Sequence, residues 1–162
     1  MRKFGRFAAL SLSAALPLFA ADLRPVKDPA KVTAVFPSSA KIRVLNVWAT
    51  WCAPCVEEMP DLRAIDDAFG KEVAIAGVSL DDMIPDAKPE KVRAFLDAQK
   101  IAFPNVYYTG APDALGDQLD FDGGVPVTIV YDGKGKELWR VHGRLERDAT
   151  IARLRNTLGR MQ

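Results

Sequence analysis

The chain has 162 residues, of which 49% are hydrophobic and 27% are charged, and its formal net charge is +1. A length of this order is typical of a single domain that can bury a substantial core. The near-balance of charge, with no basic run interleaved with aromatic residues, argues against nucleic-acid binding. We interpret the arginines near the carboxyl terminus, Arg153, Arg155 and Arg160, as the solvent-facing side of a helix.

The amino-terminal segment differs in composition from the rest of the chain. Basic residues near its start precede an uncharged, apolar run that is interrupted by Pro17. That order is typical of a secretory signal, and the run is short for a membrane span. We therefore predict a signal peptide over residues 1–21, with an uncleaved membrane anchor as the alternative. The folded domain is predicted over residues 22–162, and the predicted location is the periplasm.

The first half of the domain alternates apolar runs with helical repeats. After an entry segment that predicts no element, residues 42–48 form a run rich in β-branched side chains, which indicates a buried strand. Apolar residues at helical spacing follow and end at Gly70, which is typical of a helix terminus. Residues 73–80 predict a second buried strand, and residues 89–100 predict an amphipathic helix.

The second half predicts a short strand near Val106, a helical turn over residues 114–119 and then a hairpin. Two strand-like runs are joined by the turn sequence from Asp132 to Gly135. Asp148 is predicted to cap a last helix. Strands that alternate with helices imply a parallel core, and the hairpin adds an antiparallel edge. The predicted class is α/β, with a central mixed sheet flanked by helices.

The chain contains two cysteines, Cys52 and Cys55, which could form a structural disulfide, half of a metal site or a redox pair. A bridge between them closes a very short loop and so constrains the unfolded chain little. A metal site needs more ligands than two thiolates. The one histidine, His142, lies far along the chain in a predicted strand. We therefore favour the redox pair and expect no metal ion and no other cofactor.

Cys52 follows a predicted buried strand and stands where the next helix begins. The partial positive charge and the unpaired N–H groups of a helix N-terminus favour a thiolate. Cysteines at positions i and i+3 lie one helical turn apart, close enough for a disulfide. We expect Cys52 to be the more exposed sulfur, which attacks a substrate disulfide, and Cys55 to resolve the mixed disulfide that forms.

The motif "WCAPC" directly after "LNVWAT", with Pro60 beyond it, resembles the thioredoxin superfamily. It is most similar to the exported TlpA/ResA-like thiol:disulfide oxidoreductases. A distant second segment, "GGVPVTIVYDGKGK", resembles the part of such proteins that carries a cis-proline, which would be Pro126. The resemblance implies a thioredoxin-like fold with Cys52 and Cys55 as the catalytic pair. It also implies substrate contacts from Trp51, Val125 and Pro126.

Some residues depart from the thioredoxin pattern. Asn46 occupies the position, six before the first cysteine, at which thioredoxins carry a buried aspartate. The TlpA/ResA group commonly has asparagine there, which leaves the proton acceptor unnamed. Glu58 matches an acid common in that group, but we interpret both Glu57 and Glu58 as carboxylates that favour the first turns of a helix. An amino-terminal hairpin of the kind found in the group is not recognisable between Asp22 and Ala40.

The resemblance implies reduction of disulfides in periplasmic proteins, with apocytochrome c among the candidate clients. The neutral Ala53–Pro54 pair between the cysteines favours a reductant over an oxidant, and a membrane protein resembling DsbD or CcdA would supply the electrons. A disulfide-forming oxidant and a redox-inactive binding or chaperone module stay open as alternatives. A peroxiredoxin would carry Thr or Ser where Ala49 stands. The sequence sets no oligomeric state, and a monomer is the expectation.

Overall fold

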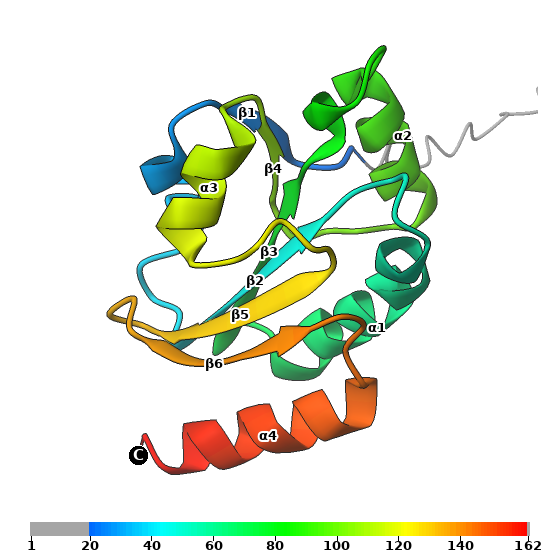
Figure 1. Ribbon diagram of the computed structural model, residues 1–162. Coiled ribbons are helices and arrows are strands. Elements are labelled where there is room, and N and C mark those ends of the chain that lie inside the picture. Colours follow the sequence, from blue (N-terminus) through cyan, green and yellow to red (C-terminus); the bar gives the residue numbers. More distant parts are fainter. Residues whose placement is uncertain (1–19, 162) are drawn as a thin grey trace, which may run out of the picture.

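The computed structural model describes residues 20–161, which form one mixed β-sheet with helices on both faces (Figure 1). The strands are β1 (Leu23–Val26), β2 (Ile42–Trp48), β3 (Val73–Ser79), β4 (Asn105–Tyr108), β5 (Val127–Asp132) and β6 (Glu137–His142). The helices are α1 (Ala53–Phe69), α2 (Pro89–Ala98), α3 (Pro112–Leu119) and α4 (Arg147–Gly159), with short 3-10 turns η1 (Pro29–Lys31) and η2 (Asp81–Met83).

The strand order is β1-β4-β3-β2-β5-β6, which places β2 and β3 at the centre of the sheet. The strands β1, β4, β3 and β2 are parallel to their neighbours, whereas β5 pairs with β2, and β6 with β5, in antiparallel fashion. Helix α4 packs along α1, and α3 lies on the other side of the sheet, next to η1 (Figure 1). The predicted α/β class with a central mixed sheet is therefore confirmed.

Most elements predicted from the sequence are present in the structure. Strand β2 has the predicted bounds, and its residues are buried along almost the whole length, as expected for a central parallel strand. The hairpin between β5 and β6 turns at the predicted position, where Asp132 Oδ1 accepts the backbone N–H of Lys134 and of Lys136. Helix α1 ends at Gly70, whose φ of +53° suits glycine.

The structure describes one segment that the sequence left open and corrects one predicted helix cap. Residues 22–40 contain a strand, β1, which pairs in parallel with β4 at the edge of the sheet. The predicted cap of the last helix is wrong, because α4 begins at Arg147 and its N-cap position is Glu146. Asp148 instead lies inside the first turn, and its carboxylate pairs with the guanidinium of Arg147.

The amino-terminal signal peptide predicted for residues 1–21 lies almost entirely outside the described residues. Within residues 20–161, no helix combines the length and the apolar character needed to cross a bilayer. Near the start of the described residues, the backbone N–H of Ala21 donates a hydrogen bond to Asp97 Oδ1 at 2.7 Å. The carbonyl of Ala21 accepts a hydrogen bond from Arg93 at 2.8 Å. These contacts tie the start of the domain to α2.

The core beneath the site is held by a hydrogen bond as well as by apolar packing. Trp48, at the end of β2, is fully buried, and its indole N–H donates to Asn105 Oδ1 at 3.1 Å. Gly77 on β3 lies against this bond: a Cβ there would be 1.9 Å from Asn105 Oδ1 and 2.8 Å from Trp48 Nε1. The absence of a side chain at Gly77 therefore makes room for the bond that fixes the carboxyl end of β2.

Candidate active site

The two cysteines lie at the junction of β2 and α1 and are joined by a disulfide. Their Cα atoms are 5.2 Å apart, and the Cys52 sulfur accepts the backbone N–H of Cys55 at 3.3 Å. Cys52 is the N-cap residue of α1, so its sulfur lies where the unpaired N–H groups of the helix point. Cys52 keeps 6% of its surface exposed and Cys55 none, so Cys52 is the sulfur that a partner can reach.

The chain returns to the cysteines at the loop before β5. The peptide bond between Val125 and Pro126 is cis, as expected from the resemblance. The Cys52 sulfur lies 3.6 Å from the carbonyl oxygen of Val125, which is half-buried, while Pro126 is buried. Trp51 is 47% exposed beside them. The structure thus brings together the five residues predicted for the site.

The loop that carries Trp51 is fixed from the side of η2. Asp81 is 3% exposed, and its carboxylate accepts the backbone N–H of Thr50 at 3.1 Å as well as the Thr50 hydroxyl. The same carboxylate accepts the hydroxyl of Ser79 at 2.7 Å. The sequence did not single out Asp81, since an acid after a strand is an ordinary loop residue. Here it holds the turn that presents Trp51 and Cys52.

Glu58 is a buried acid of α1 whose environment the sequence did not predict. It is fully buried, whereas a carboxylate that merely favours a helix start would face water as Glu57 does. Its Oε1 accepts the side-chain amide of Asn46 at 2.7 Å, and its Oε2 accepts the backbone N–H of Leu145 at 3.0 Å. The Asn46 amide also donates to the Thr128 hydroxyl at 3.1 Å. Glu58 does lie in the first turns of α1, as the sequence suggested, but its burial and its buried partners were not predicted.

Burial raises the pKa of the Glu58 carboxyl, and the bonds from Leu145 and Asn46 and the charge of Arg144 offset part of that effect. Glu58 follows Cys55 by three residues, and both are buried residues of α1. They therefore share the buried face of the helix, one turn apart. The arrangement provides a carboxyl group with an elevated pKa next to the inner cysteine.

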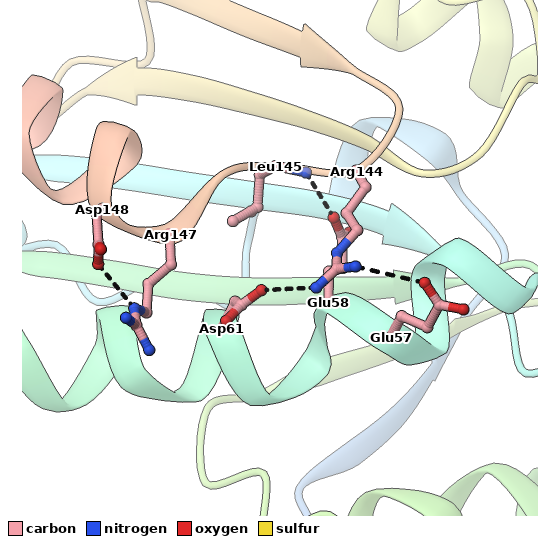
Figure 2. A network of polar contacts seen from close by, with 7 residues as sticks. All are labelled: Glu57, Glu58, Asp61, Arg144, Leu145, Arg147 and Asp148. Carbon is pink, nitrogen blue, oxygen red and sulfur yellow. Dashed lines mark hydrogen bonds and ion pairs between the residues drawn. The ribbon is translucent and has the colours of Figure 1, made fainter.

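Charged groups surround the outer side of Glu58 (Figure 2). Arg144, in the connection between β6 and α4, pairs with Glu57 Oε2 at 3.4 Å and with Asp61 Oδ2 at 3.3 Å. Both acids belong to α1, and Arg144 is about half-exposed. Leu145, the next residue, is the one whose N–H donates to Glu58. A single connection thus contacts three carboxyl groups of α1.

The residues considered for other chemistries have the following surroundings. Among residues 20–161, no group of three or more His, Cys, Asp and Glu side chains is arranged to hold a metal ion. His142 is exposed at the end of β6. Thr50 follows Ala49, the position at which a peroxiredoxin would carry Thr or Ser. Its hydroxyl donates a hydrogen bond to the Asp81 carboxylate.

Comparison with known proteins agrees with this geometry. The model of the AhpC/TSA family matches residues 17–138. The "Thiol:disulfide interchange protein HelX" of Rhodobacter capsulatus is 31% identical over 138 residues, which cover 83% of this chain and 71% of HelX. The "Thiol-disulfide oxidoreductase ResA" of Bacillus thuringiensis subsp. konkukian is 29% identical over 101 residues, which cover 61% of this chain and 53% of ResA.

Solved structures show the same fold. The crystal structure of StoA from Bacillus subtilis superposes with a TM-score of 0.59 at 21% sequence identity. The superposition covers 72% of this chain and 84% of StoA. At this identity the likeness speaks for the fold, which is that of the thioredoxin-like proteins.

Proposed function

This chain belongs to the AhpC/TSA family and is a thiol:disulfide oxidoreductase of the thioredoxin superfamily; we propose that it works outside the cytosol as a reductant. One observation carries the proposal. The Cys52–Cys55 disulfide caps α1 with the more exposed sulfur outermost, 3.6 Å from the carbonyl oxygen of Val125. A client can therefore reach the Cys52 sulfur from outside, while Cys55 shares the buried face of α1 with the carboxyl group of Glu58.

In the proposed cycle the reduced protein donates two electrons to a client disulfide. The Cys52 thiolate attacks one client sulfur, a mixed disulfide forms, and the other client sulfur leaves as a thiolate. The Cys55 thiolate then attacks the Cys52 sulfur. The remaining client sulfur leaves as a second thiolate, and the Cys52–Cys55 disulfide forms. The helix N-terminus at Cys52 favours the first step because it stabilises the attacking thiolate.

The second step needs a group that takes the proton of Cys55, and we assign that role to Glu58. A buried thiol ionises reluctantly, so a neighbouring base assists it. Glu58 lies one helical turn from Cys55 and is fully buried with it. Its raised pKa makes the carboxylate a stronger base than an exposed one. Asn46, which cannot titrate, holds the carboxyl in place with a 2.7 Å hydrogen bond.

The proposed client-binding surface consists of Trp51, Val125 and Pro126. Trp51 offers an exposed aromatic face beside Cys52. The carbonyl of Val125 points to the Cys52 sulfur, so an extended client segment that lies along this loop brings its own sulfur to Cys52. Backbone pairing of this kind tolerates many client sequences, because it depends on the main chain more than on side chains.

The amino-terminal pattern supports export, with residues 1–21 as a signal peptide or anchor and residues 22–162 as the thioredoxin-like domain. The proposed compartment is the periplasm. The neutral Ala53–Pro54 pair supports a reductant, since it supplies no charge that would strongly stabilise the Cys52 thiolate. Apocytochrome c is a proposed client, and a membrane protein resembling DsbD or CcdA is the proposed electron donor.

Reduction of insulin in the presence of dithiothreitol tests the activity. We expect turnover by the wild type and its loss in Cys52→Ser. If Cys52→Ser still binds a client as the wild type does, and the wild type reduces no insulin, a redox-inactive binding module is the better description. A redox titration against glutathione tests the direction. A potential as oxidising as that of a dedicated disulfide-forming enzyme would overturn the assignment as a reductant.

A further inference from the structure

Arg144 occupies an unusual position relative to the proposed proton acceptor. Figure 2 shows the connection between β6 and α4 lying across the first turns of α1, with the Arg144 guanidinium between Glu57 and Asp61. The adjacent Leu145 is buried and donates its N–H to Glu58 at 3.0 Å. The residue that pairs with the two outer acids is therefore joined directly to the residue that binds the inner one.

The start of α1 is rich in negative charge. Glu57, Glu58 and Asp61 lie within two turns of the helix, so ionisation of Glu58 places a third negative charge beside two others. Arg144 contacts both outer acids. Arg147, which follows three residues later, pairs with Asp148 of its own helix instead.

Apart from Arg144 and Asp61, the groups that contact the Glu58 carboxyl are uncharged. From β2 the Asn46 amide donates to it, and that amide is shared with the Thr128 hydroxyl of β5. From the β6–α4 connection it accepts the Leu145 backbone N–H. Arg144 and Asp61 are the charged side chains that act on the carboxyl. Arg144 is thus the cation on which the charge balance around Glu58 depends.

We propose that Arg144 is a positioning residue for Glu58: held between Glu57 and Asp61, it offsets the negative charge of Asp61, so that Glu58 can exist as the anion that accepts the Cys55 proton. This inference rests on the proposed role of Glu58. Without Arg144, the carboxylate of Asp61 would act on Glu58 with no cation to offset it, and repulsion would favour the neutral form of Glu58. A neutral Glu58 has no capacity to accept a proton, so resolution of the mixed disulfide would need a higher pH.

Single-turnover oxidation of the reduced protein by dithiobis(nitrobenzoate) separates the two cysteine steps. Attack by Cys52 forms a mixed disulfide and releases one coloured aromatic thiolate. Attack by Cys55 on the Cys52 sulfur forms the protein disulfide and releases the second. The dithiol is oxidised and the aromatic disulfide is reduced to two thiolates, so electrons balance. The pH dependence of the second phase reports the step in which Glu58 would act.

We expect Arg144→Gln to move the second-phase midpoint to higher pH and to slow that phase roughly two- to fivefold on its acidic side, as for loss of a partly exposed charge partner. The first phase should not change. Arg147→Gln removes a nearby arginine that pairs with Asp148 and is not among the charges acting on Glu58, so it should leave the second-phase profile as in the wild type. Arg144→Lys keeps the positive charge and should show a second-phase pH profile close to that of the wild type.

Combination with Glu58→Gln shows whether Arg144 acts through Glu58. In the Glu58→Gln background, Arg144→Gln should cause no further shift of the second phase. An equal shift in both backgrounds, or a shift by Arg147→Gln as large as that by Arg144→Gln, would overturn the inference. If Glu58→Gln alone leaves the second-phase profile unchanged, the proton-acceptor role itself fails. If Glu58→Gln alters it and Arg144→Gln does not, only the role of Arg144 fails.

Discussion

The buried Glu58 makes a specific prediction about stability and pH. Burial raises its pKa in the folded protein above that in the unfolded chain. Between those two values the folded protein holds a proton that the unfolded chain has lost, so stability falls as pH rises through this window. Glu58→Gln cannot ionise and removes this loss. We therefore expect the stability of the variant, relative to the wild type, to increase with pH.

The size of the effect has two parts. In Glu58→Gln the new carbonyl oxygen would still accept the Asn46 amide, but the new amide nitrogen cannot accept the backbone N–H of Leu145, now bonded to Glu58 at 3.0 Å. An unsatisfied buried N–H costs about 1–3 kcal/mol. At acidic pH, where Glu58 is neutral, the variant should be less stable by about that amount. At higher pH, each unit by which the pKa of Glu58 in the folded protein exceeds that in the unfolded chain raises the stability of the variant, relative to the wild type, by about 1.4 kcal/mol.

Unfolding of the oxidised proteins in guanidinium chloride measures both parts. Curves for the wild type and Glu58→Gln from about pH 4 to about pH 8 give the stability difference at each pH. Glu57→Gln is a matched control, since Glu57 is one residue away but exposed, and should change stability by less than about 0.5 kcal/mol. A Glu58→Gln deficit that stays constant or grows with pH would refute the reasoning.

Two further predictions concern the supports of the site. Gly77→Ala should destabilise the oxidised protein by about 2–4 kcal/mol in guanidinium chloride, because the new Cβ collides with the atoms of the Trp48–Asn105 hydrogen bond; a loss below about 1 kcal/mol would contradict this. Asp81→Ala should cost about 1.5–3 kcal/mol in the same assay, because the backbone N–H of Thr50 loses its carboxylate; unchanged stability would show that this bond is not needed.

Elements of the fold could be predicted where the local sequence pattern is compatible with only one kind of secondary structure. The run at residues 42–48 is apolar on both faces, which suits a central parallel strand, and it became β2 with those bounds. The turn from Asp132 to Gly135 has a residue order that favours a hairpin. By contrast, β1 spans four residues, contains Pro25 and pairs only with β4 at the sheet edge. So short a strand is fixed by its partner and not by its own composition.

The last helix shows how a local rule can be outweighed. Asp148 suits an N-cap, since its short side chain can accept a backbone N–H of the first turn. The helix begins earlier because the connection from β6 must also bury Leu145 and direct its N–H to Glu58. That tertiary contact sets where the chain can turn, so α4 starts at Arg147. An N-cap contributes about 1 kcal/mol, which is less than the cost of losing a buried hydrogen bond to a carboxyl group.

The cysteine chemistry of the candidate site was predictable, but the burial of Glu58 was not. The spacing of Cys52 and Cys55 depends only on adjacent residues, whereas the depth of Glu58 depends on what covers α1. A signal was nonetheless present: Cys55, Glu58 and Leu62 recur at the spacing of one helix face, and the structure buries all three. An acid on an apolar face must find partners or remain neutral. Such a position therefore marks a carboxyl group whose pKa is set by burial and by its partners, which here come from β2 and the β6–α4 connection.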